Sequence, residues 1–191
     1  NSLEHAVFEL AAMQARMPYV PVTPAYSLLS SDHEKLRAMV ALIRPAEVFV
    51  QEAARYQKAL RAVLTPDVRV VHVSEPVDDL ASTAWSRLIN TPTGTAVQAS
   101  LDAITPDTVA KYLFTSGSTG LPQPHAKTWG RLVQNGRAEA VGLGLLERPP
   151  VLVGTVPAQH SYGFESTFLL SLHGGCSVWS GTPFFPQDSD D

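Results

Sequence analysis

Six small residues at positions 115–120, TSGSTG, form the stretch of this sequence that is best suited to binding a charged ligand. Glycines such as Gly117 and Gly120 let the backbone approach a phosphate closely and adopt positive φ, so that several N–H groups can converge on one anion. The hydroxyl side chains of the stretch add neutral hydrogen-bond donors with little bulk; these are Thr115, Ser116, Ser118 and Thr119. We therefore expect a polyphosphate site here.

A flexible linker is the alternative interpretation, because Ser/Gly-rich segments also serve as tethers that bind nothing. Two neighbours argue against it: the strand-like run AKYLF (110–114) precedes the stretch directly, and Pro122 and Pro124 stiffen the chain beyond it. An ATPase phosphate loop is excluded, since it needs four residues between its glycines and then Gly-Lys-Ser/Thr. A hydrolase nucleophile elbow is also excluded, because Ser116 stands where Gly-x-Ser-x-Gly requires glycine before Ser118.

Strand-like and helix-like segments alternate along the rest of the chain. Apolar, β-branched runs predict strands at 47–51, 68–74, 110–114, 150–156 and 176–181. Helical spacing of apolar residues predicts helices at 1–17, 30–45, 52–64, 77–90, 128–142 and 164–175. This order predicts an α/β fold with an open, mainly parallel sheet and flanking helices. Ligands of such sheets bind beyond the carboxyl ends of the strands, which is where we expect residues 115–120 to lie between a strand and a helix.

Three local features refine this prediction. Ser31 and Glu34 have the spacing of a capping box at the start of the second helix, and Pro45 stops that helix. Residues 17–24, MPYVPVTP, read as a short extended piece at a sheet edge. Residues 91–107 are polar and contain Pro and Gly, so we expect a surface connection.

Composition narrows the class of protein. The 191 residues are 45% hydrophobic and 17% charged, as in an ordinary globular domain. The net charge of −4 and the lack of a Lys/Arg block argue against a nucleic-acid partner. No apolar run approaches the roughly 20 residues of a membrane span. A single cysteine, Cys176, fits the reducing cytoplasm, which is the expected location.

The segment LFTSGSTGLPQ (113–123) resembles the signature phosphate loop of adenylate-forming (AMP-binding) enzymes, which include acyl-CoA synthetases, aryl-CoA ligases, peptide-synthetase adenylation domains and luciferase. Two further segments resemble family segments in the same order, 17–27 (MPYVPVTPAYS) and 156–178 (VPAQHSYGFESTFLLSLHGGCSV). The first half is similar to bacterial feruloyl-CoA-type ligases. Residues 122–133 and 156–167 are similar to the ligases of aryl-polyene pigment clusters.

The resemblance implies a two-step reaction. An aromatic or fatty carboxylic acid attacks MgATP to give an acyl-adenylate, and the thiol of CoA or of a carrier protein's phosphopantetheine then displaces AMP. The implied phosphate-binding residues are Thr115, Ser116, Gly117, Ser118, Thr119 and Gly120. His160 matches the family position near the reacting carboxylate, with a structural histidine as the alternative. Tyr162, Gly163 and Phe164 would line the acyl pocket, with core packing as the alternative for Phe164.

Several departures from the family pattern qualify this expectation. The family's lysine and glycine after the loop proline are Gln123 and Pro124 here, so one positive charge is lost. Lys127 is the candidate replacement, and a solvent-exposed lysine is the alternative. We expect the chain to be a partial N-terminal AMP-binding domain spanning 1–191, with its phosphate loop at 115–124, the C-terminal domain absent and the Mg²⁺ ligand elsewhere. Such a fragment would be inactive alone.

Two other functional interpretations remain open. A non-catalytic nucleotide- or acyl-binding module, or a truncated pseudo-enzyme, would account for Gln123 and for the short chain. A dinucleotide-binding domain is disfavoured, because GLGLLE (142–147) lacks the third glycine and the preceding strand of the Gly-x-Gly-x-x-Gly pattern.

Overall fold

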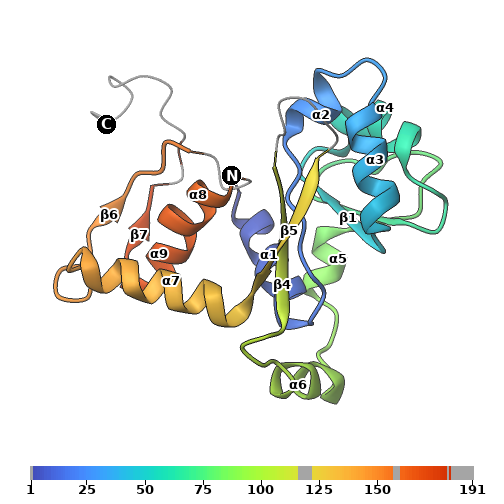
Figure 1. Ribbon diagram of the computed structural model, residues 1–191. Coiled ribbons are helices and arrows are strands. Elements are labelled where there is room, and N and C mark those ends of the chain that lie inside the picture. Colours follow the sequence, from blue (N-terminus) through green and yellow to red (C-terminus); the bar gives the residue numbers. More distant parts are fainter. Residues whose placement is uncertain (1, 116–121, 157–159, 180, 182–191) are drawn as a thin grey trace.

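An antiparallel hairpin lies at the centre of the computed structural model, which describes residues 2–115, 122–156, 160–179 and 181 (Figure 1). Its strands are β4 (Val109–Thr115) and β5 (Gln123–Thr128). Thr115 pairs with Gln123 at one end and Val109 with Thr128 at the other. The other edge of β4 contacts the extended chain at Tyr19, whose N–H donates to the Ala110 carbonyl at 2.9 Å. The predicted extended piece at 17–24 therefore lies at a sheet edge.

A parallel three-stranded sheet forms the lobe on one side of the hairpin (Figure 1). Its strands, in spatial order, are β1 (Glu47–Val50), β2 (Arg69–His72) and β3 (Ser82–Ala84). Its helices are α2 (Pro24–Leu28), α3 (Glu34–Ile43), α4 (Ala53–Val63) and α5 (Trp85–Ile89). Buried aliphatic residues of β1, β2, α4 and the loop before β3 form the core: Val50, Ala53, Leu60, Val70 and Val77. Continuous apolar runs such as RVVH are typical of parallel strands that are covered on both faces.

A helical lobe lies on the other side of the hairpin (Figure 1). It contains α7 (Trp129–Gly142), the short α8 (Ser161–Gly163), the π-helical turn η1 (Phe164–Leu169), α9 (Leu170–Gly174) and the parallel pair β6 (Val151–Leu152) and β7 (Ser177–Val178). A second core joins this lobe to the hairpin and to α1 (Leu3–Gln14). Its buried members are Met13, Ala110, Leu132, Phe164 and Leu169.

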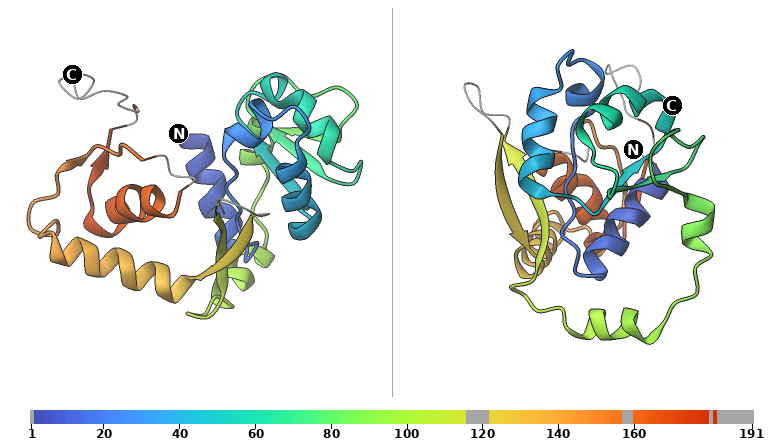
Figure 2. Two further views of the ribbon diagram at one scale, coloured as in Figure 1. Left: turned by 45° about the horizontal axis from the view of Figure 1, so that its top comes forward. Right: turned by 90° about the vertical axis from the view of Figure 1, so that its right-hand side faces the viewer.

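The predicted α/β class with a parallel sheet and flanking helices is confirmed, but several elements differ from the prediction. Residues 123–128 form β5, because β4 takes an antiparallel partner at its second edge. Residues 77–90 contain the strand β3 before α5, since the free edge of β2 pairs there. The expected connection 91–107 contains α6 (Thr95–Asp102), a helix with no buried residue at the outside of the molecule (Figure 2).

The start of α3 differs from the predicted capping box. His33 is the N-cap and has a left-handed backbone, with φ 56°. Ser30 Oγ accepts a hydrogen bond from the His33 N–H at 2.9 Å, and Asp32 Oδ1 accepts one from the Glu34 N–H at 3.1 Å. The cap therefore uses the two polar residues on either side of Ser31 in place of Ser31 itself. Among the described residues, no helix is both long and apolar enough to cross a membrane.

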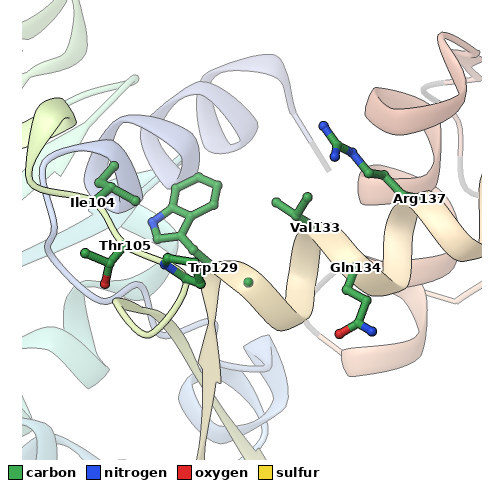
Figure 3. A pocket seen from close by; sticks show the side chains of 8 residues that line it. Ile104, Thr105, Trp129, Val133, Gln134 and Arg137 are labelled. Carbon is green, nitrogen blue, oxygen red and sulfur yellow. The ribbon is translucent and has the colours of Figure 1, made fainter.

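The start of α7 packs tightly against the loop at 104–106, beside an open hollow of about 550 Å³ (Figure 3). The Gly130 N–H donates to the Pro106 carbonyl at 2.8 Å. A Cβ atom at Gly130 would lie 2.8 Å from Pro106 Cβ and 2.9 Å from its carbonyl oxygen. Glycine is therefore required here by contact with a rigid neighbour.

We expect Gly130→Ala to lower the free energy of unfolding by about 1–3 kcal/mol, because the added methyl group overpacks the contact with Pro106. Gly142→Ala, at the other end of α7, is the matched control, since a Cβ there meets nothing within 4 Å. It should be neutral or stabilising by up to about 1 kcal/mol, from helix propensity. Urea unfolding measures the free energy of unfolding of both variants. Equal changes in the two variants would contradict the tight contact between Gly130 and Pro106.

Candidate functional site

The hairpin holds both ends of the stretch that sequence analysis singled out. Thr115 is the exposed last residue of β4, and Gln123, opposite it, is the first residue of β5. The other predicted phosphate-binding residues lie outside the described residues: Ser116, Gly117, Ser118, Thr119 and Gly120. The expectation that the stretch joins a strand to a helix at the end of a parallel sheet is wrong, because it joins two antiparallel strands.

Lys127, on β5, forms an ion pair with the helical lobe. Its Nζ donates to Glu165 Oε1 at 3.1 Å, and Asn135 Nδ2 of α7 donates to Glu165 Oε2 at 3.3 Å. The Lys127 and Glu165 side chains are 29% and 20% exposed. Lys127 is thus not the free, solvent-exposed lysine of the alternative interpretation. A phosphate that used this ammonium would have to compete with a carboxylate already in place.

A hollow of about 390 Å³ lies next to this ion pair. It is lined by Lys127, Glu139, Tyr162, Glu165 and Ser166. The fold thereby brings together two predicted site residues, Lys127 and Tyr162, from segments far apart in the sequence. One ammonium faces two carboxylates, so the formal charge of the lining does not by itself attract an anion. The aromatic ring of Tyr162, which is largely exposed, gives the hollow an apolar side against which a planar group can pack.

The other residues predicted around the acyl pocket are placed differently. His160 is exposed, and its carbonyl accepts a hydrogen bond from the Phe164 N–H at 2.9 Å. Gly163 is buried, and Phe164 is completely buried in the core between α1, β4 and α7. Among the described residues that were predicted to line the pocket, Tyr162 lines the hollow, whereas Phe164 follows the core-packing alternative.

Sequence analysis missed a buried ion pair beneath this site. Lys111 of β4 is 0% exposed, and its Nζ donates to Glu9 Oε1 of α1 at 2.6 Å. The ammonium also lies 3.1 Å from the centre of the Phe164 ring and 5.7 Å from that of Tyr19. The available signals were a lysine inside the apolar run AKYLF and a glutamate inside an apolar helix, but nothing local links residues 102 positions apart.

Burial and charge shift the pKa values of this group. Burial lowers the pKa of Lys111 to about 8, although the Glu9 carboxylate acts in the opposite direction. Burial raises the pKa of Glu9, against the opposing effect of Lys111. His5 Nε2 hydrogen-bonds the Tyr19 hydroxyl, and the His5 ring stacks on Phe49. Burial, helped by the positive charge of Lys111, lowers the pKa of His5 to about 4.

Comparison with known proteins decides the family. The model of a family described as AMP-binding enzyme matches residues 1–189 of the chain. The chain belongs to this family. The TSGSTG sequence and the order of the flanking segments agree with this membership.

Two curated relatives match shorter stretches. A 4-coumarate–CoA ligase from Halorhodospira halophila is 46% identical over 50 residues, which is 26% of this chain and 12% of that protein. A 4-coumarate–CoA ligase from Rhodobacter capsulatus is 34% identical over 73 residues, which is 38% of this chain and 19% of that protein. The matched part is therefore less than a fifth of either relative.

Solved structures share the fold over the whole chain. The apo structure of MbtA from Mycobacterium smegmatis superposes with a TM-score of 0.74 at 22% identity, covering 99% of this chain and 34% of that one. The ATP-bound structure of MatB from Rhodopseudomonas palustris gives a TM-score of 0.63 at 20% identity, covering 99% of this chain and 35% of that one. At these identities the likeness establishes the fold, and the chain spans about a third of each structure.

The half-buried His5, with its lowered pKa, predicts a specific pH dependence of stability. Between its ordinary pKa of 6.5 and its folded pKa of about 4, the imidazole is neutral in the folded state and protonated in the unfolded state. The unfolded state then binds more protons, so stability falls as the pH falls through this window. At 1.36 kcal/mol per pKa unit, the loss between pH 7 and pH 4 should be about 1–3 kcal/mol.

Urea unfolding at both pH values tests this prediction against His5→Gln, which should lack that part of the loss. His125→Gln, the same change at an exposed histidine of β5, should lose as much stability as the parent. If all three proteins lose stability equally on acidification, His5 does not carry the effect.

Proposed function

We propose that the full-length protein uses ATP to activate a carboxylic acid and then transfers the acyl group to a thiol. In the first step a carboxylate oxygen attacks the α-phosphorus of ATP, the bond from that phosphorus to the bridging oxygen breaks, and pyrophosphate leaves. In the second step the thiolate of CoA, or of a carrier protein's phosphopantetheine, attacks the acyl carbon and AMP leaves. The observation that carries the proposal is the TSGSTG stretch within the family match, held at both ends by paired strands.

The chain's contribution to the first step would be positioning and electrostatics, because phosphoryl chemistry leaves little covalent work to the protein. Backbone N–H groups and hydroxyls of residues 115–120 would hold the β- and γ-phosphates while pyrophosphate departs. The paired ends of the stretch support this role, since a phosphate cradle must be fixed in place to stabilise charge as it develops. His160 is proposed to orient the acid or the incoming thiol as the catalytic histidine.

An aromatic or fatty acid is the proposed substrate class. The two curated relatives are named for 4-coumarate, an aromatic acid, and Tyr162 offers an aromatic face at the hollow. Within the described part of the chain, no group of three or more His, Cys, Asp or Glu side chains could hold a metal ion. Magnesium bound with ATP usually needs only one or two carboxylates of the protein, and we propose that its ligand lies elsewhere in the protein.

A non-catalytic nucleotide- or acyl-binding module is the second candidate. Gln123, exposed at the first position of β5, supports it because the family pattern has a positively charged lysine there. The two candidates differ in one measurable property. An enzyme exchanges labelled pyrophosphate into ATP when the acid is present, whereas a binding module holds ATP without exchange.

We expect Gly117→Val to lower the rate of 4-coumarate-dependent ATP–pyrophosphate exchange at least about a hundredfold, as loss of preorganised donors does elsewhere. The branched side chain would block both the close backbone approach and positive φ. Gly94→Val is the control, since a Cβ there meets nothing within 4 Å. A folded Gly117→Val protein that exchanges at the parent's rate would refute the phosphate assignment. ATP binding without exchange in the parent would favour the module.

The ion pair between Lys127 and Glu165 allows a second test, because substitutions of its two partners should change the KM for ATP differently. If Lys127 contacts phosphate during turnover, Lys127→Met should raise the KM for ATP about tenfold to a hundredfold, the usual effect of losing a charged hydrogen bond. Glu165→Gln should leave the KM for ATP unchanged or lower it, since it releases the lysine. Equal increases in both variants would show that the pair is structural.

A further inference from the structure

Lys111 belongs to the strand that precedes the proposed phosphate-binding stretch and contacts the start of η1. Its strand, β4, ends at Thr115, the first residue of the phosphate-binding stretch. Its ammonium lies 3.1 Å from the centre of the Phe164 ring, at the start of η1. Phe164 directly follows Tyr162 and Gly163, and its N–H donates to the carbonyl of His160 at 2.9 Å. One side chain therefore joins the phosphate-binding strand to the turn that carries the proposed acid-binding residues.

Burying the charge of Lys111 costs free energy, and this cost indicates a role other than stability. A buried ion pair is often no more stable than apolar residues of the same volume, because removing two charges from water costs as much as their attraction returns. Stability alone thus gives little reason for Lys111 and Glu9 in this core. An ammonium over an aromatic face, by contrast, fixes the position of the ring, because the attraction depends on the cation lying near the ring centre.

The neighbouring strand, β5, also contacts η1, through the ion pair between Lys127 and Glu165. Lys127 lies directly opposite Lys111 in the β4–β5 ladder, and such pairs project to the same face of a sheet. Lys127 forms an ion pair with Glu165, and the Lys111 ammonium lies over the Phe164 ring. The two facing lysines therefore contact consecutive residues of η1. The Lys127 pair is partly exposed to solvent, whereas the Lys111 contact is sealed in the core.

We infer that Lys111, held by Glu9, is a positioning residue that fixes Phe164 and thereby sets the acid-binding turn at 160–164 relative to the phosphate-binding stretch. Lys111 and Thr115 lie on the same face of β4, about 13 Å apart along the strand. The contact would keep the acid side of the site in place even when Lys127 releases Glu165. This inference rests on the proposed function, because the positioning matters only if both halves hold reactants.

The kinetic test uses the full-length protein, with 4-coumarate as the probe acid, in ATP–pyrophosphate exchange. The variant is Glu9→Gln with Lys111→Leu, which removes both charges and so leaves no unpaired buried ion. We expect the KM for 4-coumarate to rise about fivefold to thirtyfold, the range of a desolvated cation–π contact. The KM for ATP should change less than about threefold. Phe164→Leu should show the same split between the two KM values.

Met13→Ala is the control for a purely structural effect. Met13 belongs to the same core as Phe164 and is equally buried. This variant should lower the melting temperature without raising the KM for the acid selectively. If the double variant keeps the parent's KM for 4-coumarate, or if Met13→Ala shows the same KM split, Lys111 has no positioning role.

A spectroscopic measurement tests the contact without relying on activity. In protein with ¹³C-labelled lysine, the Lys111 side-chain signals are those missing from the Lys111→Leu spectrum. At pH 6.5, below the Lys111 pKa of about 8, the ammonium is charged and the ring current of Phe164 should shift these signals upfield. Phe164→Leu should return them to ordinary positions, and signals that Phe164→Leu does not move would overturn the contact. A parent without exchange activity but with shifted signals would overturn the proposed function, and with it the role in acid binding.

Discussion

The positive charge of Lys111 must be stabilised inside the core, and the groups around it come from three separate segments of the chain. Glu9 belongs to α1, Tyr19 to the extended segment beside β4, and Phe164 to η1. Removing Glu9 would leave the buried ammonium without its counter-ion, which costs about 3–5 kcal/mol. The helical lobe, α1 and the hairpin therefore cannot shift independently of one another without exposing or isolating this charge.

The hairpin adds a second constraint, because it fixes both ends of the stretch on which the proposed chemistry depends. Pairing of Thr115 with Gln123 sets where the chain leaves β4 and where it enters β5. Sites built on strands are held more accurately than sites built on loops alone. The large hollow beside Trp129 lies at the other end of the hairpin, where Val109 pairs with Thr128. This hollow therefore lies away from the proposed phosphate-binding stretch.

Elements with a strong local signal could be predicted from the sequence, and elements chosen by tertiary pairing could not. The runs EVFV and RVVH, and the periodic helix at 53–63, follow directly from apolar patterning. Strand β5 carries Pro124, His125 and Lys127, none of which favours a strand, and it forms because β4 offers an edge. Phe164 could serve a pocket or a core equally well by residue type. Its place in the core is decided by neighbours distant in sequence, as is the pairing of Lys111 with Glu9.

Both lysines in the described part of the site are paired with carboxylates before any nucleotide is present, and this bears on how the proposed first step would work. Lys111 is matched by Glu9, and Lys127 by Glu165, whose other oxygen is held by Asn135. A polyphosphate could recruit Lys127 only by drawing its ammonium away from the Glu165 carboxylate. The family pattern's lysine is absent at Gln123, so no unengaged cation stands at that position. If the protein activates acids as proposed, we expect the phosphate contacts made by this chain to come mainly from the neutral N–H and hydroxyl donors of residues 115–120. Lys127 could add a positive charge to them only by exchanging its carboxylate partner for a phosphate.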